Sequence, residues 1–97
     1  MSAPTRVRGV PGIVFQWVTD GGPCDPMPIS EGKQILIEVR GNLSGPVAIT
    51  GSLIGGEDMP ALDQTKKSPW FAVLPPVSFI QPVTESKGVT IYLKVLP

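Results

Sequence analysis

Proline and glycine limit what this chain can fold into more than any other feature of its sequence. Twelve prolines and eleven glycines lie among its 97 residues and separate short runs rich in β-branched and aromatic side chains. Proline lacks the N–H that an α-helix needs, and no apolar pattern with helical spacing continues for three turns. Short strands divided by turn residues predict an all-β fold, a small β-sandwich or barrel of about six to eight mostly antiparallel strands.

Six segments are expected to form strands, because each combines β-branched residues with apolar side chains at alternate positions. They are residues 12–19, 34–40, 47–53, 70–74, 77–81 and 89–95. The alternation is clearest where Ile35, Ile37 and Val39 are expected to face inward. Segments 34–40 and 47–53 are predicted to pair as a hairpin across the intervening Gly- and Pro-containing turn.

The chain is expected to comprise an extended N-terminal arm, residues 1–11, and a single β-sandwich domain, residues 12–97. Pro4 and Pro11 exclude a helix in the arm. Two roles for the arm remain open: a short strand that closes the edge of the sheet, or a segment that reaches a neighbouring subunit.

Three further segments are expected to lack strands. Residues 20–28 contain three prolines and two glycines, which disfavour regular structure. Residues 54–69 are predicted to form a long polar connection with a short amphipathic turn at 60–63. Residues 83–88 are predicted to form a turn, and Pro82 suggests a sheet edge or a bulge just before it.

The charged and reactive side chains exclude several classes of function. Eight basic and eight acidic residues cancel, there is no histidine, and there is one cysteine. Catalytic dyads and triads that use imidazole are therefore excluded, and one cysteine makes neither an internal disulfide nor a cysteine-based zinc site. A general nucleic-acid binder would be basic. We therefore expect no enzyme, no metal, no cofactor, no small-molecule substrate and no nucleic-acid partner.

No membrane segment or secretion signal is expected. The longest apolar stretch, residues 70–80, is interrupted by Pro75 and Pro76 and is far shorter than the about 20 residues of a transmembrane helix. Residues 1–6 lack the apolar core of a signal peptide. Synthesis in a reducing cytoplasm is expected, and the single Cys24 is consistent with it.

Acidic residues in the glycine-rich loops are weak candidates for a cation site. Asp20, Asp25 and Glu31 lie close together in sequence, but their spacing matches no calcium-binding loop, so turn capping and solubility explain them better. Glu57 and Asp58 are adjacent, and on a strand they would point to opposite faces.

The aromatic side chains could form a platform on which sugars stack. Trp17 is expected on the core face with Ile13 and Phe15, and Trp70 is also expected in the core. Tyr92 alternates outward and is the better surface candidate.

One run of the chain follows a recognisable order. A strand leads into the glycine-containing turn 41–45, and the next strand ends in Gly51-Ser52-Leu53. A glycine-rich loop follows, and Trp70-Phe71 opens another strand. This order resembles small structural proteins of tailed-bacteriophage virions, and residues 77–95 resemble the strand-turn-strand that closes their β-sandwiches.

The resemblance implies a virion protein, made in the host cytoplasm, that acts as a capsid decoration (cement) protein. Such a protein would bind the outside of an assembled phage head and stabilise junctions between subunits of the major capsid protein. A tail, baseplate or neck component, or a carbohydrate- or host-surface-binding β-sandwich, are the alternatives. A homo-oligomer is expected, because closed symmetric assemblies are common.

Partner contacts are expected from segments 1–11, 20–28 and 54–69, because proline-rich and extended segments lose little entropy when they bind. The candidate contact residues are Arg6, Arg8, Pro11, Pro23, Pro26, Met27, Pro28, Met59, Lys66, Lys67 and Tyr92.

Overall fold

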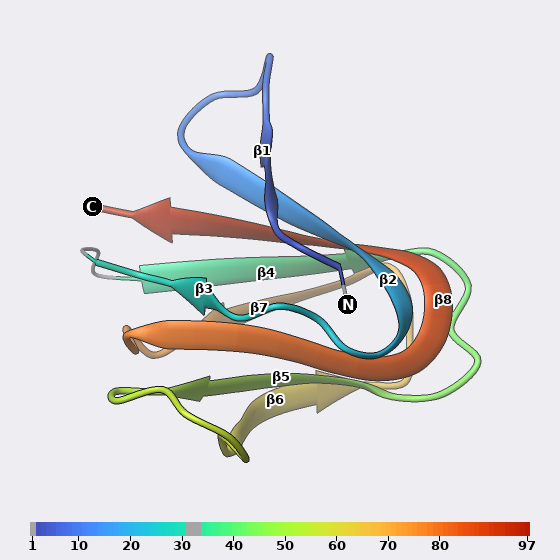
Figure 1. Cartoon of the computed structure of the whole chain (residues 1–97). Coiled ribbons are helices and arrows are strands. Elements are labelled where there is room, and N and C mark those ends of the chain that lie inside the picture. Colours follow the sequence, from blue (N-terminus) through green and yellow to red (C-terminus); the bar gives the residue numbers. More distant parts are fainter. Residues whose placement is uncertain (1, 31–33) are drawn as a thin grey trace.

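The computed structural model describes residues 2–30 and 34–97, and this part of the chain consists of β-strands and their connections (Figure 1). The strands are β1 (Thr5–Val7), β2 (Val14–Pro23), β3 (Met27–Pro28), β4 (Gln34–Arg40), β5 (Val47–Ser52), β6 (Ala61–Thr65), β7 (Trp70–Leu74) and β8 (Phe79–Leu96). Every pairing between them is antiparallel. The expected all-β class is therefore confirmed. No helix in the described residues is long and apolar enough to cross a membrane.

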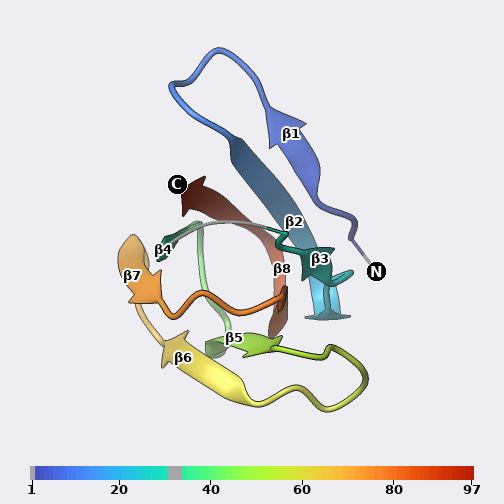
Figure 2. The same cartoon turned by 90° about the vertical axis from the view of Figure 1, so that its left-hand side faces the viewer.

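The eight strands form one sheet that curves strongly around a common interior, as Figure 2 shows. One layer has the strand order β1-β2-β8-β4-β7. The other layer contains β5 and β6, and β5 pairs with the first half of β8. β8 belongs to both layers, because its first half pairs with β3 and β5 and its second half with β4. β2 follows β8 around the bend, with two register shifts on the way.

The bend in β8 lies where a turn was predicted. Residues 83–88 remain within this 18-residue strand, so the prediction of two strands separated by a turn is wrong. Buried hydroxyl groups replace part of the ladder at the bend: the Val89 N–H donates to Thr19 Oγ1 at 3.0 Å, and the Ser86 N–H donates to Thr84 Oγ1 at 3.1 Å. The polar residues that suggested a turn therefore support a sharply curved strand.

Pro82 lies inside β8 rather than at the edge of the sheet, and it is buried. The hydrogen bonds around Pro82 explain why a residue without an N–H is tolerated at this position. The Pro82 carbonyl accepts a hydrogen bond from the Cys24 N–H at 2.9 Å, and in a strand the N–H and C=O of one residue point to the same side. The missing N–H thus faces Cys24, whose carbonyl accepts instead from the Gln81 side-chain amide at 2.8 Å.

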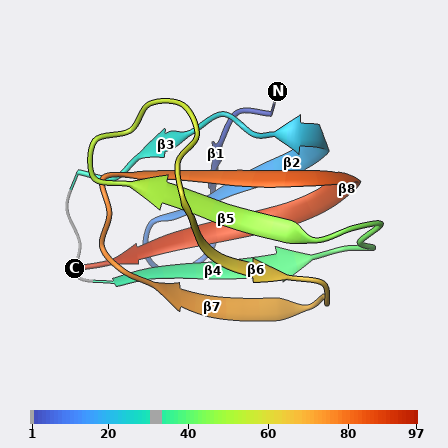
Figure 3. The same cartoon turned by 90° about the horizontal axis from the view of Figure 1, so that it is seen from below.

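The predicted hairpin of residues 34–40 with 47–53 is also wrong. β4 pairs with β7 and β8, whereas β5 pairs with β6 and β8. The connection between β4 and β5 therefore crosses from one layer to the other, as Figure 3 shows.

Two segments expected to be irregular contain strands. β2 extends through residues 20–23, and β3 pairs with the beginning of β8, so residues 20–28 are largely ordered by the sheet. Within 54–69, the expected amphipathic turn at 60–63 is the beginning of β6, which pairs with β5. Long-range pairing overrides the local turn signals in both places.

The core lies between the two layers and is apolar. Its buried members are Trp17, Cys24, Met27, Ile35, Ile37, Val39, Val47, Ile49, Leu74, Ile80, Val89, Ile91 and Leu93. The predicted inward face of β4 is therefore confirmed. Ile13 departs from its expected place on the core face, because it precedes β2 and is 53% exposed.

The N-terminal segment belongs to the same sheet. β1 pairs with β2, and the Ser2 carbonyl accepts a hydrogen bond from the Asp25 N–H at 2.8 Å. Residues 1–11 therefore include a strand at the edge of the sheet, which is one of the two roles left open for this segment. β1, β2 and the loop between them form a hairpin that projects beyond the rest of the sheet (Figure 1).

Candidate protein-binding groove

The outer face of the layer β1-β2-β8-β4-β7 carries a mixed apolar and charged surface. Side chains alternate along a strand, so each inward residue of β4 is followed by an outward one. Glu38 pairs with Tyr92 of β8 on one side and with Phe71 of β7 on the other, which aligns these three outward side chains. Leu36 is aligned in the same way with Lys94.

The β1–β2 hairpin converts this face into a groove of about 420 Å³. Val7, Val10, Pro11 and Val14 come from the hairpin, and Leu36, Ile37, Glu38, Arg40, Phe71, Tyr92 and Lys94 come from the sheet. Most of the lining is apolar, and charged groups lie among it. An apolar surface with charged groups at its margin is the composition found where proteins bind protein segments.

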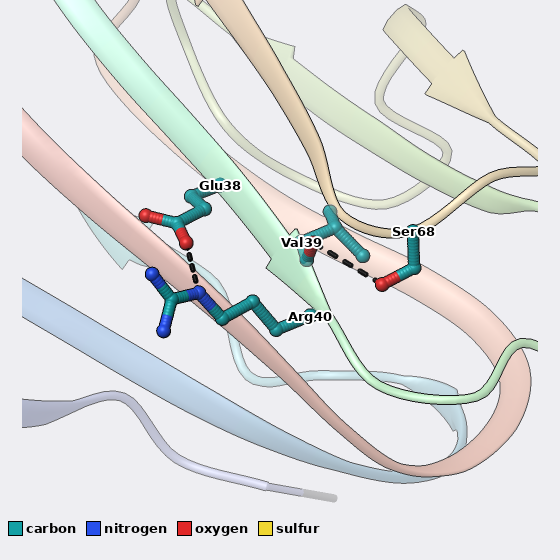
Figure 4. A network of polar contacts seen from close by, with 4 residues as sticks. All are labelled: Glu38, Val39, Arg40 and Ser68. Carbon is teal, nitrogen blue, oxygen red and sulfur yellow. Dashed lines mark hydrogen bonds and ion pairs between the residues drawn. The ribbon is translucent and has the colours of Figure 1, made fainter.

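Charged side chains in the groove are organised around Tyr92. Glu38 and Arg40 extend from the same side of β4 and form an ion pair, as Figure 4 shows. The Arg40 guanidinium also lies over the Tyr92 ring, 5.7 Å from its centroid, within the range of a cation–π contact. At the end of the strand, Ser68 Oγ donates to the Val39 carbonyl at 3.4 Å.

Gly12 brings the hairpin loop close to Lys94. A Cβ at this position would lie 2.8 Å from Lys94 Cε, and the backbone has φ +78°, which L side chains rarely adopt. Glycine therefore allows the hairpin to meet the lysine stem at the margin of the groove.

A second hollow of about 840 Å³ lies at the end of the sheet where β2 begins and β3 and β8 end. Ile13, Phe15, Met27, Pro28, Ile29 and Leu96 supply its apolar lining. The two hollows share one lining residue, Lys94.

Most of the predicted contact residues lie on the surface. Arg6, Arg8, Pro11, Pro23, Pro26, Pro28, Lys66 and Lys67 are exposed, and Tyr92 is half-buried. Met27 and Met59 are each only 8% exposed. Met27 belongs to the core because β3 pairs with β8, and Met59 is buried in the loop before β6.

The structure distributes these candidates over several regions. Pro11 and Tyr92 line the groove, and Pro28 lines the second hollow. Arg6 lies on β1 with its guanidinium 6.0 Å from the centroid of the Phe15 ring. Lys67 lies in the turn between β6 and β7, so no single surface unites all of the candidates.

The two tryptophans that were expected in the core differ in how completely they are buried. Trp17 is completely buried, and its Nε1–H donates to the Asp25 carbonyl at 2.8 Å. Trp70 is half-buried and packs against the core. Trp17 therefore has no face free for a sugar ring, and Tyr92 is engaged by Arg40.

The acidic residues predicted in one loop are only partly described, and the two described carboxylates, Asp20 and Asp25, both act electrostatically on Cys24. Asp20 lies in β2, Asp25 follows it, and Glu31 lies outside the described residues. No cluster of three or more metal-ligating side chains occurs in the part of the chain that is described. Cys24 is buried, and burial raises the pKa of its thiol above the ordinary value of 9.0.

Several residues of the surface were not anticipated from sequence. Phe71 and Val73 are 69% and 62% exposed and point outward from β7, and Phe71 lines the groove. Segment 70–74 is apolar at every position, which is typical of a strand that is covered on both faces. That pattern was the sequence signal for the exposed apolar side chains of β7.

Comparisons with protein-family models, with curated proteins and with solved structures gave no match.

Proposed function

We propose that this chain is a non-catalytic structural protein that binds a neighbouring protein subunit through the groove beneath the β1–β2 hairpin. The observation that carries the proposal is the groove itself, an apolar channel of about 420 Å³ bounded by Arg40 and Lys94. Exposed apolar side chains rimmed by charged ones are typical of surfaces that bind protein partners.

In its specific form, the proposal is a capsid decoration protein on the head of a tailed bacteriophage. Support for this form comes from the resemblance of residues 35–95 to small virion proteins. A rigid sheet with a projecting hairpin suits such a role, because many individually weak contacts become strong on a repeating lattice. The complete burial of Trp17 favours a protein partner over a carbohydrate.

Co-sedimentation tests the proposal. Purified full-length chain is mixed with expanded empty heads of the phage that encodes it and pelleted, and the bound amount is measured against concentration. Binding that saturates at a fixed ratio to the major capsid protein is expected. A chain that remains in the supernatant at every concentration would contradict the decoration role and direct the search to tail or baseplate components.

Two valines provide a matched pair of variants for the same assay. Val10 lines the groove and is 45% exposed, whereas Val18 lies on β2 outside the groove and is 49% exposed. Val10→Lys is expected to weaken head binding by about tenfold or more, and Val18→Lys is expected to bind like the unmodified chain. Equal losses in both variants would mean that the groove is not the contact.

A further inference from the structure

β7 is an edge strand of the sheet, and β6 approaches it without pairing with it. In the described part of the chain it pairs only with β4. Figures 2 and 3 both place it at the margin of the molecule. Soluble proteins usually protect such an edge with a charge, a proline within the strand or a bulge. The strand Trp70-Phe71-Ala72-Val73-Leu74 contains none of these.

The backbone groups on the free side can be assigned from the ladder. The Val39 carbonyl accepts a hydrogen bond from Ser68 and so points toward β7, where Val39 is paired with Trp70. Hydrogen-bonding residues alternate along an antiparallel pair. Trp70, Ala72 and Leu74 therefore bond to β4, and the N–H and C=O groups of Phe71 and Val73 point to the free edge.

We infer that β7 pairs with β7 of a second copy, antiparallel, about a two-fold axis at Ala72. This register places Phe71 opposite the partner's Val73, so both residues present their free backbone groups to each other. It also matches the faces of the sheet, because outward residues oppose outward ones and the half-buried Trp70 opposes the buried Leu74.

The prolines that flank β7 are placed symmetrically about the same two-fold axis. Pro69 and Pro75 lie three residues before and after Ala72. They confine pairing to the five residues of β7. The contact is therefore isologous and closes at two copies, because each chain uses the same edge.

Charge and area set the strength of this contact. The formal net charge is zero, so two copies approach without net repulsion. Phe71, Val73 and the strand backbone would bury on the order of 400 Å² per copy, about half that of a standard interface. A weak dimer is the consequence, with a Kd of roughly 10 µM to 1 mM.

Sedimentation equilibrium of the full chain over that concentration range tests the dimer. The weight-average mass is expected to rise from 10.3 kDa toward twice that value. Val73→Lys is expected to weaken association by about tenfold or more, since an edge lysine opposes pairing. Ile54→Lys is the matched control, because Ile54 is 89% exposed on a loop. A mass that stays at one copy, or a Val73→Lys variant that associates like the unmodified chain, overturns the inference.

Disulfide cross-linking tests the register. Directly opposite residues of a hydrogen-bonded pair have Cα atoms about 5.5 Å apart, within reach of a disulfide. An oxidised equal mixture of Phe71→Cys and Val73→Cys proteins is expected to form cross-linked dimers. Neither variant alone should do so, because identical positions would lie about 8 Å apart. Cross-linking of Phe71→Cys alone overturns this register.

The dimer stands independently of the proposed function. Self-association is measured without phage heads, and Val73 does not line the groove tested with Val10. Phe71 lines the groove and also belongs to the dimer contact, so the two surfaces adjoin, and Val10→Lys and Val73→Lys test them through residues that they do not share.

Discussion

The bend shared by β2 and β8 depends on a small number of buried hydroxyl groups, and Thr19 provides the sharpest test of them. Its Oγ1 accepts the Val89 N–H at 3.0 Å, and Thr19 and Val89 are 3% and 0% exposed. Thr19→Val keeps the β-branched shape and replaces the hydroxyl group, and with it the acceptor of the Val89 N–H, by a methyl group. The N–H is then buried without a partner, which costs about 1–3 kcal/mol.

This magnitude is easily measured in a chain of 97 residues. A loss of about 2 kcal/mol lowers the Tm by roughly 8–16 °C in a domain of this size. Urea denaturation followed by tryptophan fluorescence is expected to show a lower midpoint with an unchanged slope, because the same surface is exposed on unfolding.

Two further variants separate the hydrogen bond from other effects. Thr19→Ser keeps the acceptor and loses one methyl group, at a cost of about 1 kcal/mol. Thr90→Val, at a half-buried position of β8, changes stability by no more than about 0.5 kcal/mol. If Thr19→Val were as stable as Thr19→Ser or more so, the argument that hydroxyl groups sustain the bend would be refuted.

Three other predictions concern a close approach, a buried thiol and the hairpin. Gly51→Ala is expected to destabilise the protein by about 1–3 kcal/mol in urea denaturation, because a Cβ would lie 2.8 Å from the Phe79 carbonyl oxygen; a neutral result would contradict this packing. Burial raises the pKa of the Cys24 thiol above 9.0, so the thiol ionises first in the unfolded state. The stability linked to this thiol is therefore complete below about pH 9 and lost as the pH rises through the folded-state pKa, and a Cys24→Ala variant should lack that part of the decline in Tm. Gly12→Ala is expected to cost about 1 kcal/mol because of the positive φ, whereas the flexible end of the Lys94 side chain can move away; an unchanged Tm would argue against the observed loop conformation.

Local pattern predicted the bounds of two strands. The bounds expected for 34–40 and 70–74 coincide with β4 and β7. The alternation of Ile35, Ile37 and Val39 also identified the inward face. Burial selects apolar residues with period two, so a strand in the middle of a layer carries its orientation in its own composition.

The candidate site was predicted only in part. Pro11 and Tyr92 were named and line the groove, but Phe71 and Val10 were not. The groove exists because β1 folds back on β2 while β4 and β7 align beside β8, which brings together residues distant in sequence. The local sequence pattern of each strand does not specify which distant strand becomes its neighbour.

By itself, the sequence determined the all-β class and the inward face of β4, because proline, glycine and β-branched residues act on the backbone within a few positions. Only the tertiary structure decided that residues 79–96 form one bent strand, that β4 and β5 separate into different layers, and that β7 is left with a free edge. Those outcomes depend on hydrogen bonds between distant segments. Thr84 and Ser86 illustrate the difference, since the same hydroxyl groups stabilise a turn in isolation and a curved strand beside β2.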